Sequence, residues 1–245
     1  MPLLLAPITP PHALSWVRIR NLAYQGPTHD CIHTSPISDA SLRSVAADWA
    51  RNLGKKNTWH WRVLDTDLAS EDGEEEGRTV GIAVWSMHNV PQSSDDEDVA
   101  KQKEQEENHT PFTPPEVRLD ALTSLLAPLR AAQPQLMPPS HPPYLMLNQL
   151  ATHPDHQRRG IGSMLLDWGL RKADAEGLVC YLSASGAGKG MYEKREFEVR
   201  KVVEWERAGW GGEGVDRYWC MVREVVKGEE GAREGGRGGG DAVGI

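Results

Sequence analysis

The chain has 245 residues, a formal net charge of -8 and a hydrophobic fraction of 39%. This length suits one domain with extensions or two small domains. The acidic balance argues against nucleic acid as the main partner and fits a cationic substrate such as an amine. The three cysteines, Cys31, Cys180 and Cys220, lie far apart and form no CxxC pair, so we expect neither a disulfide framework nor a metal site.

Residues 1–16 contain a short apolar run that is interrupted by proline and lacks a basic leader. We therefore expect no secretion signal. No apolar run in the chain is long enough to span a bilayer, so we expect no membrane partner. These features predict a cytoplasmic protein, with a nuclear location as the alternative, and they leave the oligomeric state open.

The first ninety residues combine helical and strand patterns. Apolar residues recur at helical spacing over 11–25, and Ser38 offers an N-cap for a helix over 39–53 that Gly54 closes. Two runs rich in β-branched and aromatic residues follow. The patterns predict two helices and then two strands, the strands at 58–66 and 79–88.

The composition changes between 89 and 143. A charged run with almost no apolar residues precedes a stretch with many prolines. We predict an insertion that is mostly disordered or loosely ordered, and we interpret its acidic run as solvated surface rather than a binding arm. Leucines at helical spacing predict one short helix near 115–131 that packs back on the domain.

The last hundred residues alternate between strand and helix patterns. We predict strands and helices at 144–152, 161–176, 178–184, 187–195, 197–206 and 216–226. The glycine-rich tail 228–245 is predicted to be disordered. This order of elements predicts an α/β (α+β) fold with a mixed sheet, in a single domain over 1–227.

The segment Gln157-Arg158-Arg159-Gly160-Ile161-Gly162 joins a predicted strand to an amphipathic helix. Backbone N–H groups in such a turn converge with the unpaired donors of the helix N-terminus, and this arrangement binds anions. The glycines let the backbone approach a phosphate without a Cβ in the way. The turn therefore predicts a pyrophosphate site, to which Arg158 and Arg159 add charge unless they face water.

The same segment resembles motif A of the Gcn5-related N-acetyltransferase (GNAT) superfamily, Q/R-x-x-G-x-G/A, and the preceding H-P-D-H is similar to the family's usual lead-in. The downstream run LVCYLSASGAGKGMYEKREFEV resembles the family's next strand and its motif B, in which a tyrosine precedes a phenylalanine. The two motifs cover about 144–200, and 58–88 more weakly resembles the family's second and third strands. The resemblance implies a mostly antiparallel central sheet, flanked by helices, with one splayed pair of strands that binds CoA.

The resemblance also implies where acetyl-CoA would bind. The strand 147–152 should carry a bulge and diverge from 178–184, and the pantetheine arm would pair with backbone groups in the gap. The Leu150 N–H would polarise the thioester carbonyl. The implied binding residues are Leu150, Ala151, Thr152, Gln157, Arg158, Arg159, Gly160, Ile161, Gly162 and Ser163.

The resemblance makes Tyr192 the acid that protonates the departing thiolate. Glu196 stands where motif B usually has glycine, which costs roughly 1 kcal/mol if the backbone there is left-handed. Met146 and Asn148 occupy the positions of two histidines of arylalkylamine acetyltransferases. A histidine base is therefore not expected, although Asn148 can orient a water. The alternative bases are Glu204, Glu206 and Asp216.

Three histidines need no catalytic role in this interpretation. His153 and His156 are expected to be solvated loop residues, and His60, which stands between two tryptophans in a predicted strand, is expected to serve packing rather than chemistry. The resemblance thus implies direct acetyl transfer from acetyl-CoA to a primary amine of a small molecule, without a metal. The alternatives are an N-terminal or lysine acetyltransferase acting on proteins, and a non-catalytic acyl-CoA-binding module.

Overall fold

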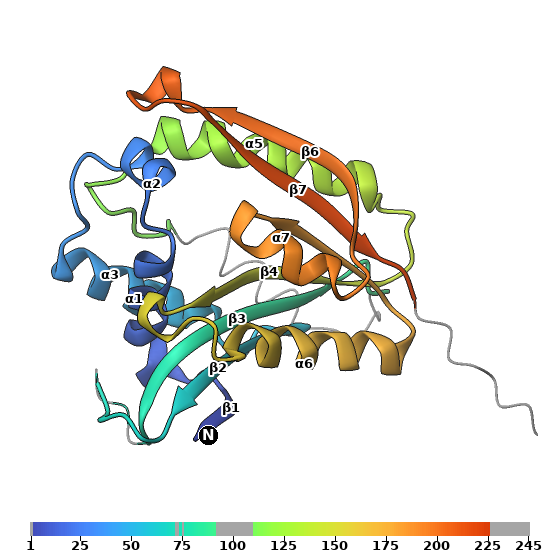
Figure 1. The fold of residues 1–245 in the computed structure, drawn as a ribbon, viewed down its shortest axis with the longest axis horizontal. Coiled ribbons are helices and arrows are strands. Elements are labelled where there is room, and N and C mark those ends of the chain that lie inside the picture. The colour runs from blue at the N-terminus through green and yellow to red at the C-terminus, as the bar shows by residue number, and fades with distance from the viewer. Residues whose placement is uncertain (1, 72–73, 75, 92–109, 226–245) are drawn as a thin grey trace, which may run out of the picture.

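The computed structural model describes residues 2–71, 74, 76–91 and 110–225. Its strands form one sheet in the order β1-β2-β3-β4-β5-β7-β6 (Figure 1). The neighbouring strands are antiparallel except for the parallel pair β4 and β5. The predicted mixed and mostly antiparallel sheet is therefore confirmed.

The strands span β1 (Leu3–Pro7), β2 (Thr58–Asp65), β3 (Arg78–His88), β4 (Tyr144–Thr152), β5 (Val179–Ala184), β6 (Glu198–Glu206) and β7 (Val215–Arg223). The helices span α1 (Ala13–Ala23), α2 (Pro27–Ile32), α3 (Asp39–Trp49), α5 (Leu119–Leu136), α6 (Ile161–Glu176) and α7 (Gly186–Glu193). Short 3₁₀ turns precede α1, follow α3, precede α6 and form the tip of the β6–β7 hairpin. The bounds of β4 and α6 agree with the prediction to the residue.

Helices cover both faces of the sheet. On one face α6 packs against β2, β3 and β4 in the largest apolar cluster, which includes Val63, Trp85 and Leu165. On the other face α1 and α3 pack over Ile82 and Ala151. Helix α5 packs on β6 and β7 in a cluster with Tyr181 and further buried side chains.

Helices α1 and α5 share one face of the sheet. Ile82, Val84 and Ser86 alternate on β3 and therefore point to the same side. The first two pack with α1, whereas Ser86 is paired across the strands with Met146, which packs in the α5 cluster. On this face, the middle of β3 and β4 therefore lies between the part of the sheet that α1 covers and the part that α5 covers.

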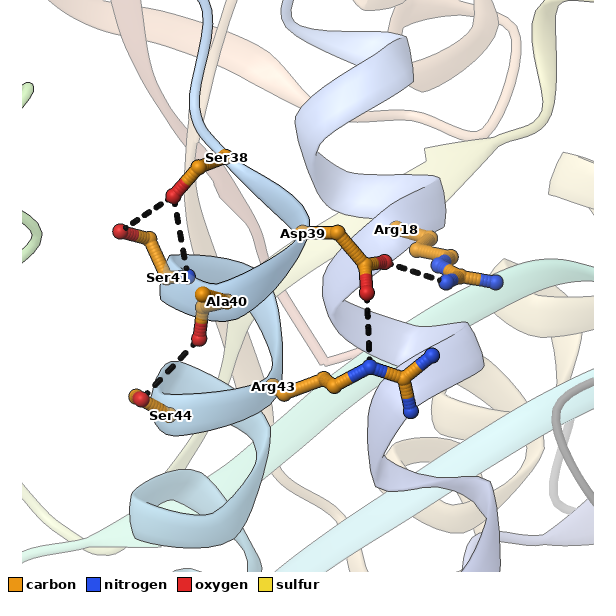
Figure 2. A network of polar contacts seen from close by, with 7 residues as sticks. All are labelled: Arg18, Ser38, Asp39, Ala40, Ser41, Arg43 and Ser44. Carbon is orange, nitrogen blue, oxygen red and sulfur yellow. Dashed lines mark hydrogen bonds and ion pairs between the residues drawn. The ribbon is translucent and has the colours of Figure 1, made fainter.

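The contact between α1 and α3 includes a surface network (Figure 2). The Arg18 Nη2 donates to Asp39 Oδ1 at 2.6 Å, and Arg43 donates to the other oxygen of the same carboxylate. Ser38 caps α3 as predicted, because its hydroxyl accepts from the Ser41 N–H. These exposed ion pairs contribute little energy, so the apolar contact of Trp16 stacked on Trp49 dominates.

Three parts of the fold differ from the sequence prediction. The edge strand β1 and the six-residue helix α2 were not predicted, and α5 extends to Leu136 rather than 131. Pro128 and Pro134 lie inside α5. A proline inside a helix costs about 3 kcal/mol, and burial of Leu125 and Ala132 against the sheet offsets this cost.

The insertion is more ordered than predicted, because residues 110–143 carry α5 and its flanking segments. The disorder predicted for 92–109 and for the tail 228–245 lies outside the described residues. None of the described helices combines the length and the apolar character that a bilayer crossing requires.

Candidate active site

The strand β4 carries the expected bulge. Its pairing with β3 passes from Trp85 opposite Leu147 to Val84 opposite Gln149, so Asn148 is the extra residue. The pairing of β4 with β5 ends at Leu147. Beyond that residue the two strands diverge, which is the splay implied by the resemblance (Figure 1).

The second half of β4 points backbone N–H groups toward the gap. The His153 N–H donates to the Val80 carbonyl on β3 at 2.9 Å. Because successive N–H groups of a strand point to opposite sides, those of Leu150 and Thr152 point away from β3 and toward the gap, whereas that of Ala151 points to β3. The gap is therefore edged by donors of the kind that pair with an extended amide-bearing chain.

The turn after β4 has the backbone of an anion site. Arg158 has φ 64°, and Gly160 has φ 84° at the N-cap of α6. These left-handed residues turn the chain so that Ile161, Gly162 and Ser163 form the first helical turn. A Cβ on Gly160 would meet no atom within 4 Å, so the backbone is open on that side.

Gly162 links this turn to the gap. A Cβ at this position would lie 3.4 Å from the Met191 Sδ and 3.6 Å from the Leu150 Cδ2. The side chains of Met191 on α7 and Leu150 on β4 therefore both lie beside the first turn of α6. The turn and the edge of β4 consequently lie side by side.

The two arginines of the turn have different surroundings. Arg158 is exposed. Arg159 donates to the buried Asp65 at 2.7 Å and lies 3.1 Å from the Nδ1 of His156. The charge of Arg159 is thus balanced by Asp65, and its role is to fasten the turn to β2.

The sequence predicted that the two loop histidines are solvated, but both make specific contacts. His153 caps the 3₁₀ turn by accepting from the Asp155 N–H, and His156 contacts Arg159. His60 packs as expected, since it is buried with its ring edge-on to Trp49, and burial lowers its pKa to about 4. All three have structural explanations.

Tyr192 lies on α7 in the apolar cluster that Leu150 also contacts. It is 7% exposed, and its ring meets Phe197 at 5.9 Å between centroids. Burial, and secondarily the nearby Tyr24, raises the pKa of Tyr192 above the usual value of a phenol. The side chain therefore keeps its proton at neutral pH.

Glu196 has φ 66°, so the left-handed conformation foreseen for this position is present without a glycine. The Phe197 N–H donates to the Tyr192 carbonyl at 3.2 Å, which closes α7. The departure from motif B therefore does not displace Tyr192 from Phe197.

Two of the alternative bases have cationic partners. Asp216 accepts from Thr28 at 2.7 Å and from Arg207 at 2.6 Å. Glu204 accepts from Arg217 at 2.6 Å. Each carboxylate is therefore already held by an arginine and would have to leave that partner to serve as the base.

The residues on the acceptor side of the site, opposite the turn at Gly160, were not predicted from the sequence. Tyr24 follows α1, and Gln149 comes directly after the bulge residue, opposite Val84, which packs with α1. Burial raises the pKa of Tyr192 on α7 and of Tyr218 on β7, and Tyr24 adds a smaller contribution to both. These residues come from distant segments, and only the bulge at Asn148 could have drawn attention to Gln149.

Further contacts connect the end of the insertion to the acceptor side. Arg118 donates to the carbonyls of Cys31 and Trp210 at 3.3 and 3.1 Å. His33 forms a β-bridge with Val117, and α2 lies beneath the tip of the β6–β7 hairpin (Figure 1). The end of the insertion therefore joins α2 to the hairpin.

Comparisons with known proteins agree with this geometry. The model of the acetyltransferase (GNAT) domain matches residues 133–199. No curated protein sequence matches the chain closely enough to count as a relative.

Solved structures provide the comparison over nearly the whole chain. Arylalkylamine N-acetyltransferase 2 from Aedes aegypti is 10% identical, with a TM-score of 0.56 over 91% of this chain and 99% of that one. A histone acetyltransferase HPA2 and related acetyltransferase from Corynebacterium glutamicum is 16% identical, with a TM-score of 0.54 over 94% and 99%. Drosophila melanogaster polyamine N-acetyltransferase is 11% identical, with a TM-score of 0.53 over 91% and 100%. At these identities the likeness to the solved structures concerns the fold, and the resemblance to the acetyltransferase (GNAT) domain is confirmed by the domain model over residues 133–199.

Proposed function

We propose that the protein transfers the acetyl group of acetyl-CoA to a primary amine of a small molecule, by direct attack in a ternary complex. The observation that carries this proposal is the bulged half of β4, which directs the Leu150 N–H into a gap beside the open helix N-terminus at Gly160.

The described residues fit acetyl-CoA, which supplies the acetyl group as a thioester. Backbone groups of Leu150 and Thr152 would pair with the pantetheine arm along the gap, while Ala151 keeps the strand on β3. The backbone from Gln157 to Ser163 would hold the pyrophosphate, since this turn combines left-handed residues with the first N–H groups of α6. The exposed Arg158 would add charge, and Arg159 would keep the turn in place.

In the transfer step the amine nitrogen attacks the carbonyl carbon, a C–N bond forms and the C–S bond breaks. The Leu150 N–H stabilises the negative charge that develops on the carbonyl oxygen. The Tyr192 hydroxyl gives its proton to the sulfur, and the nitrogen loses one proton to solvent. Burial raises the pKa of Tyr192. The hydroxyl therefore still carries its proton when the thiolate departs.

The contacts around α2 favour a small acceptor over a polypeptide. A peptide would need a continuous groove between α2 and the β6–β7 hairpin. The Thr28–Asp216 hydrogen bond and the bridge made by Arg118 tie these two segments to each other. A small amine needs no such groove.

The test combines acetyl-CoA titration calorimetry with thiol release on a panel of tryptamine, agmatine, spermidine and peptides with free N-termini or lysines. We expect acetyl-CoA binding and turnover with at least one small amine. Turnover with peptides alone would make the protein a polypeptide acetyltransferase. Binding of acetyl-CoA without turnover on any amine would make it a non-catalytic acyl-CoA-binding module.

A further inference from the structure

The bulge of β4 places two consecutive amide side chains on the same face of the sheet. Asn148 reaches Ser86 on that face, and Gln149 lies opposite Val84, which packs with α1. In a regular strand these two side chains would point to opposite faces. The extra residue removes this alternation, which is a recognised use of a bulge beside a functional site. Both amides therefore face the side between α1 and α5.

Asn148 is held by a chain of hydrogen bonds. Its Nδ2 lies 2.7 Å from the Ser86 Oγ, which in turn lies 2.7 Å from the Nε2 of His88. His88 is stacked on Tyr144, whose hydroxyl accepts from Gln133 on α5. Burial lowers the pKa of His88, so its ring is neutral at physiological pH and Nε2 can accept from Ser86. Ser86 then accepts from Asn148.

This chain fixes which atom of the Asn148 amide faces outward. Within the described residues both hydrogen bonds of Asn148 are donated by Nδ2, to Ser86 and more weakly to the Met146 carbonyl at 3.5 Å. The carbonyl oxygen Oδ1 is left as an acceptor on an exposed side chain. That side chain stands where the pairing of β4 with β5 ends, two residues before Leu150.

We propose that the Asn148 Oδ1 accepts a hydrogen bond from the attacking amine, and that Ser86 and His88 are positioning residues that hold this oxygen outward. The inference rests on the proposed function and extends it to the acceptor. Leu150 and Asn148 would then act from consecutive parts of one strand, the first on the carbonyl oxygen and the second on the nitrogen.

The chemistry of an amide suits this role. One N–H of a neutral primary amine can point at Oδ1 while the lone pair points at the thioester. As the C–N bond forms, positive charge develops on the nitrogen, and the carbonyl dipole of Asn148 interacts more strongly with it. Because the interaction grows in the transition state, its loss lowers kcat as well as raising the KM of the amine. An amide cannot take the proton, so the proton passes to solvent.

The experiment uses the panel amine with the highest kcat/KM of the wild-type protein. For Asn148→Ala we expect the amine KM to rise and kcat to fall by about tenfold each, as one hydrogen bond to a charged group is lost. For Ser86→Ala we expect changes in the same direction of about fivefold, since Asn148 is retained but no longer held. The Kd of acetyl-CoA should stay within about twofold in both variants, because neither side chain points to the turn at Gly160.

Three comparisons separate positioning from a general loss of structure. Ser86→Thr keeps the hydroxyl, so its amine KM and kcat should stay within about twofold of the wild-type values. Adding Ser86→Ala to Asn148→Ala should cause no further loss, since Ser86 acts through Asn148. Ser44→Ala removes a hydroxyl that donates to Ala40 within α3 (Figure 2) and should change nothing.

The failures of the two proposals are distinguishable. Transfer by the wild type together with unchanged amine kinetics in Asn148→Ala would overturn this inference and leave the proposed function standing. Additive losses in the double variant would overturn the positioning role of Ser86. Absence of transfer by the wild-type protein on the whole panel would overturn both proposals.

Discussion

The two sides of the candidate site are built in different ways. The acetyl-CoA side consists of one continuous segment, from β4 through the turn at Gly160 to α6. The acceptor side is assembled from the end of α1, α2, the end of the insertion and the β6–β7 hairpin, which side-chain contacts hold together. Backbone geometry therefore determines the first side, and tertiary contacts determine the second.

This contrast predicts which measurements respond to which changes. Changes in the continuous segment should affect the affinity for acetyl-CoA. Changes in the acceptor side should affect the amine kinetics and leave acetyl-CoA binding intact. A variant of one side that changes the measurement assigned to the other side would weaken this contrast.

The largest effect is expected for Gly160→Trp. An indole there would fill the open side of the turn, and we expect the Kd of acetyl-CoA to rise about 100-fold or more because the pyrophosphate would lose its place. The measurement is titration calorimetry on protein shown to be folded by circular dichroism.

Gly177→Trp is the matched control. Gly177 has φ 62° at the other end of α6, and a Cβ there also meets no atom within 4 Å. The two variants share the cost of a side chain at positive φ, so only a loss specific to Gly160 indicates a binding role. A folded Gly160→Trp protein with wild-type affinity would contradict the placement of the pyrophosphate.

The second effect is expected for Tyr192→Phe, which removes a hydroxyl and keeps the ring against Phe197. If the hydroxyl is the acid, kcat should fall by roughly 100-fold while the Kd of acetyl-CoA stays constant. Burial raises the pKa of Tyr192 above its usual value. The wild-type activity should therefore not decline through loss of this proton up to about pH 10.

Tyr181→Phe is the control for this change. Tyr181 is fully buried within the α5 cluster and its hydroxyl lies 3.4 Å from the Ser183 Oγ, so it has no role in the proposed reaction. A Tyr192→Phe protein with wild-type kcat from pH 6 to about pH 10 would reduce Tyr192 to a packing residue and assign protonation of the sulfur to water.

The third effect is expected for Arg118→Ala, which cuts the bridge between α2 and the hairpin. We expect the amine KM to rise about fivefold, as two hydrogen bonds that fix the acceptor side are lost, with no change in the Kd of acetyl-CoA. Arg130→Ala, which removes an exposed arginine within α5, the helix that Arg118 precedes, should leave both values unchanged. A rise in the acetyl-CoA Kd of Arg118→Ala would show that the two sides are not independent.

The same contrast explains how much of the molecule could be predicted from the sequence. The bounds of β4 and α6 were predicted to the residue, and for α6 the signal is an apolar period that lies between Gly160 and Gly177. The bulge and the splay followed from the family resemblance, since nothing in the local pattern of β4 specifies an extra residue.

The acceptor side could not be predicted in the same way. The six residues of α2 form a helix too short for a periodic signal, and contacts to Asp216 hold it. The helix α5 runs past its predicted end at residue 131 and contains Pro134, and burial against the sheet offsets the cost of that proline. The pairing of Asn148 with Ser86 joins residues 62 positions apart, which no local pattern reveals.

The smallest effect is expected for Glu196→Gly, which tests the departure from motif B. A non-glycine residue in the left-handed region costs about 1 kcal/mol, so the glycine variant should be more stable by about that amount. The free energy of unfolding in urea measures this gain. Glu193→Gly, at the helical end of α7, should lose about 1 kcal/mol, since glycine is unfavourable inside a helix.

The loss of the Glu196 charge opposes this gain in stability, but its effect is small. The pKa of Arg223 lies above its usual value. Burial lowers it, but the hydrogen bond that Arg223 donates to Asp174, together with weaker contributions that include the charge of Glu196, outweighs that effect. Loss of an exposed charge typically costs a few tenths of a kcal/mol, less than the backbone gain. If Glu196→Gly is instead less stable than the wild type, the carboxylate contributes more than the strain costs. If kcat also falls while the protein is more stable, Glu196 positions Tyr192 through the closure of α7 at Phe197, and motif B here depends on a residue that the family pattern lacks.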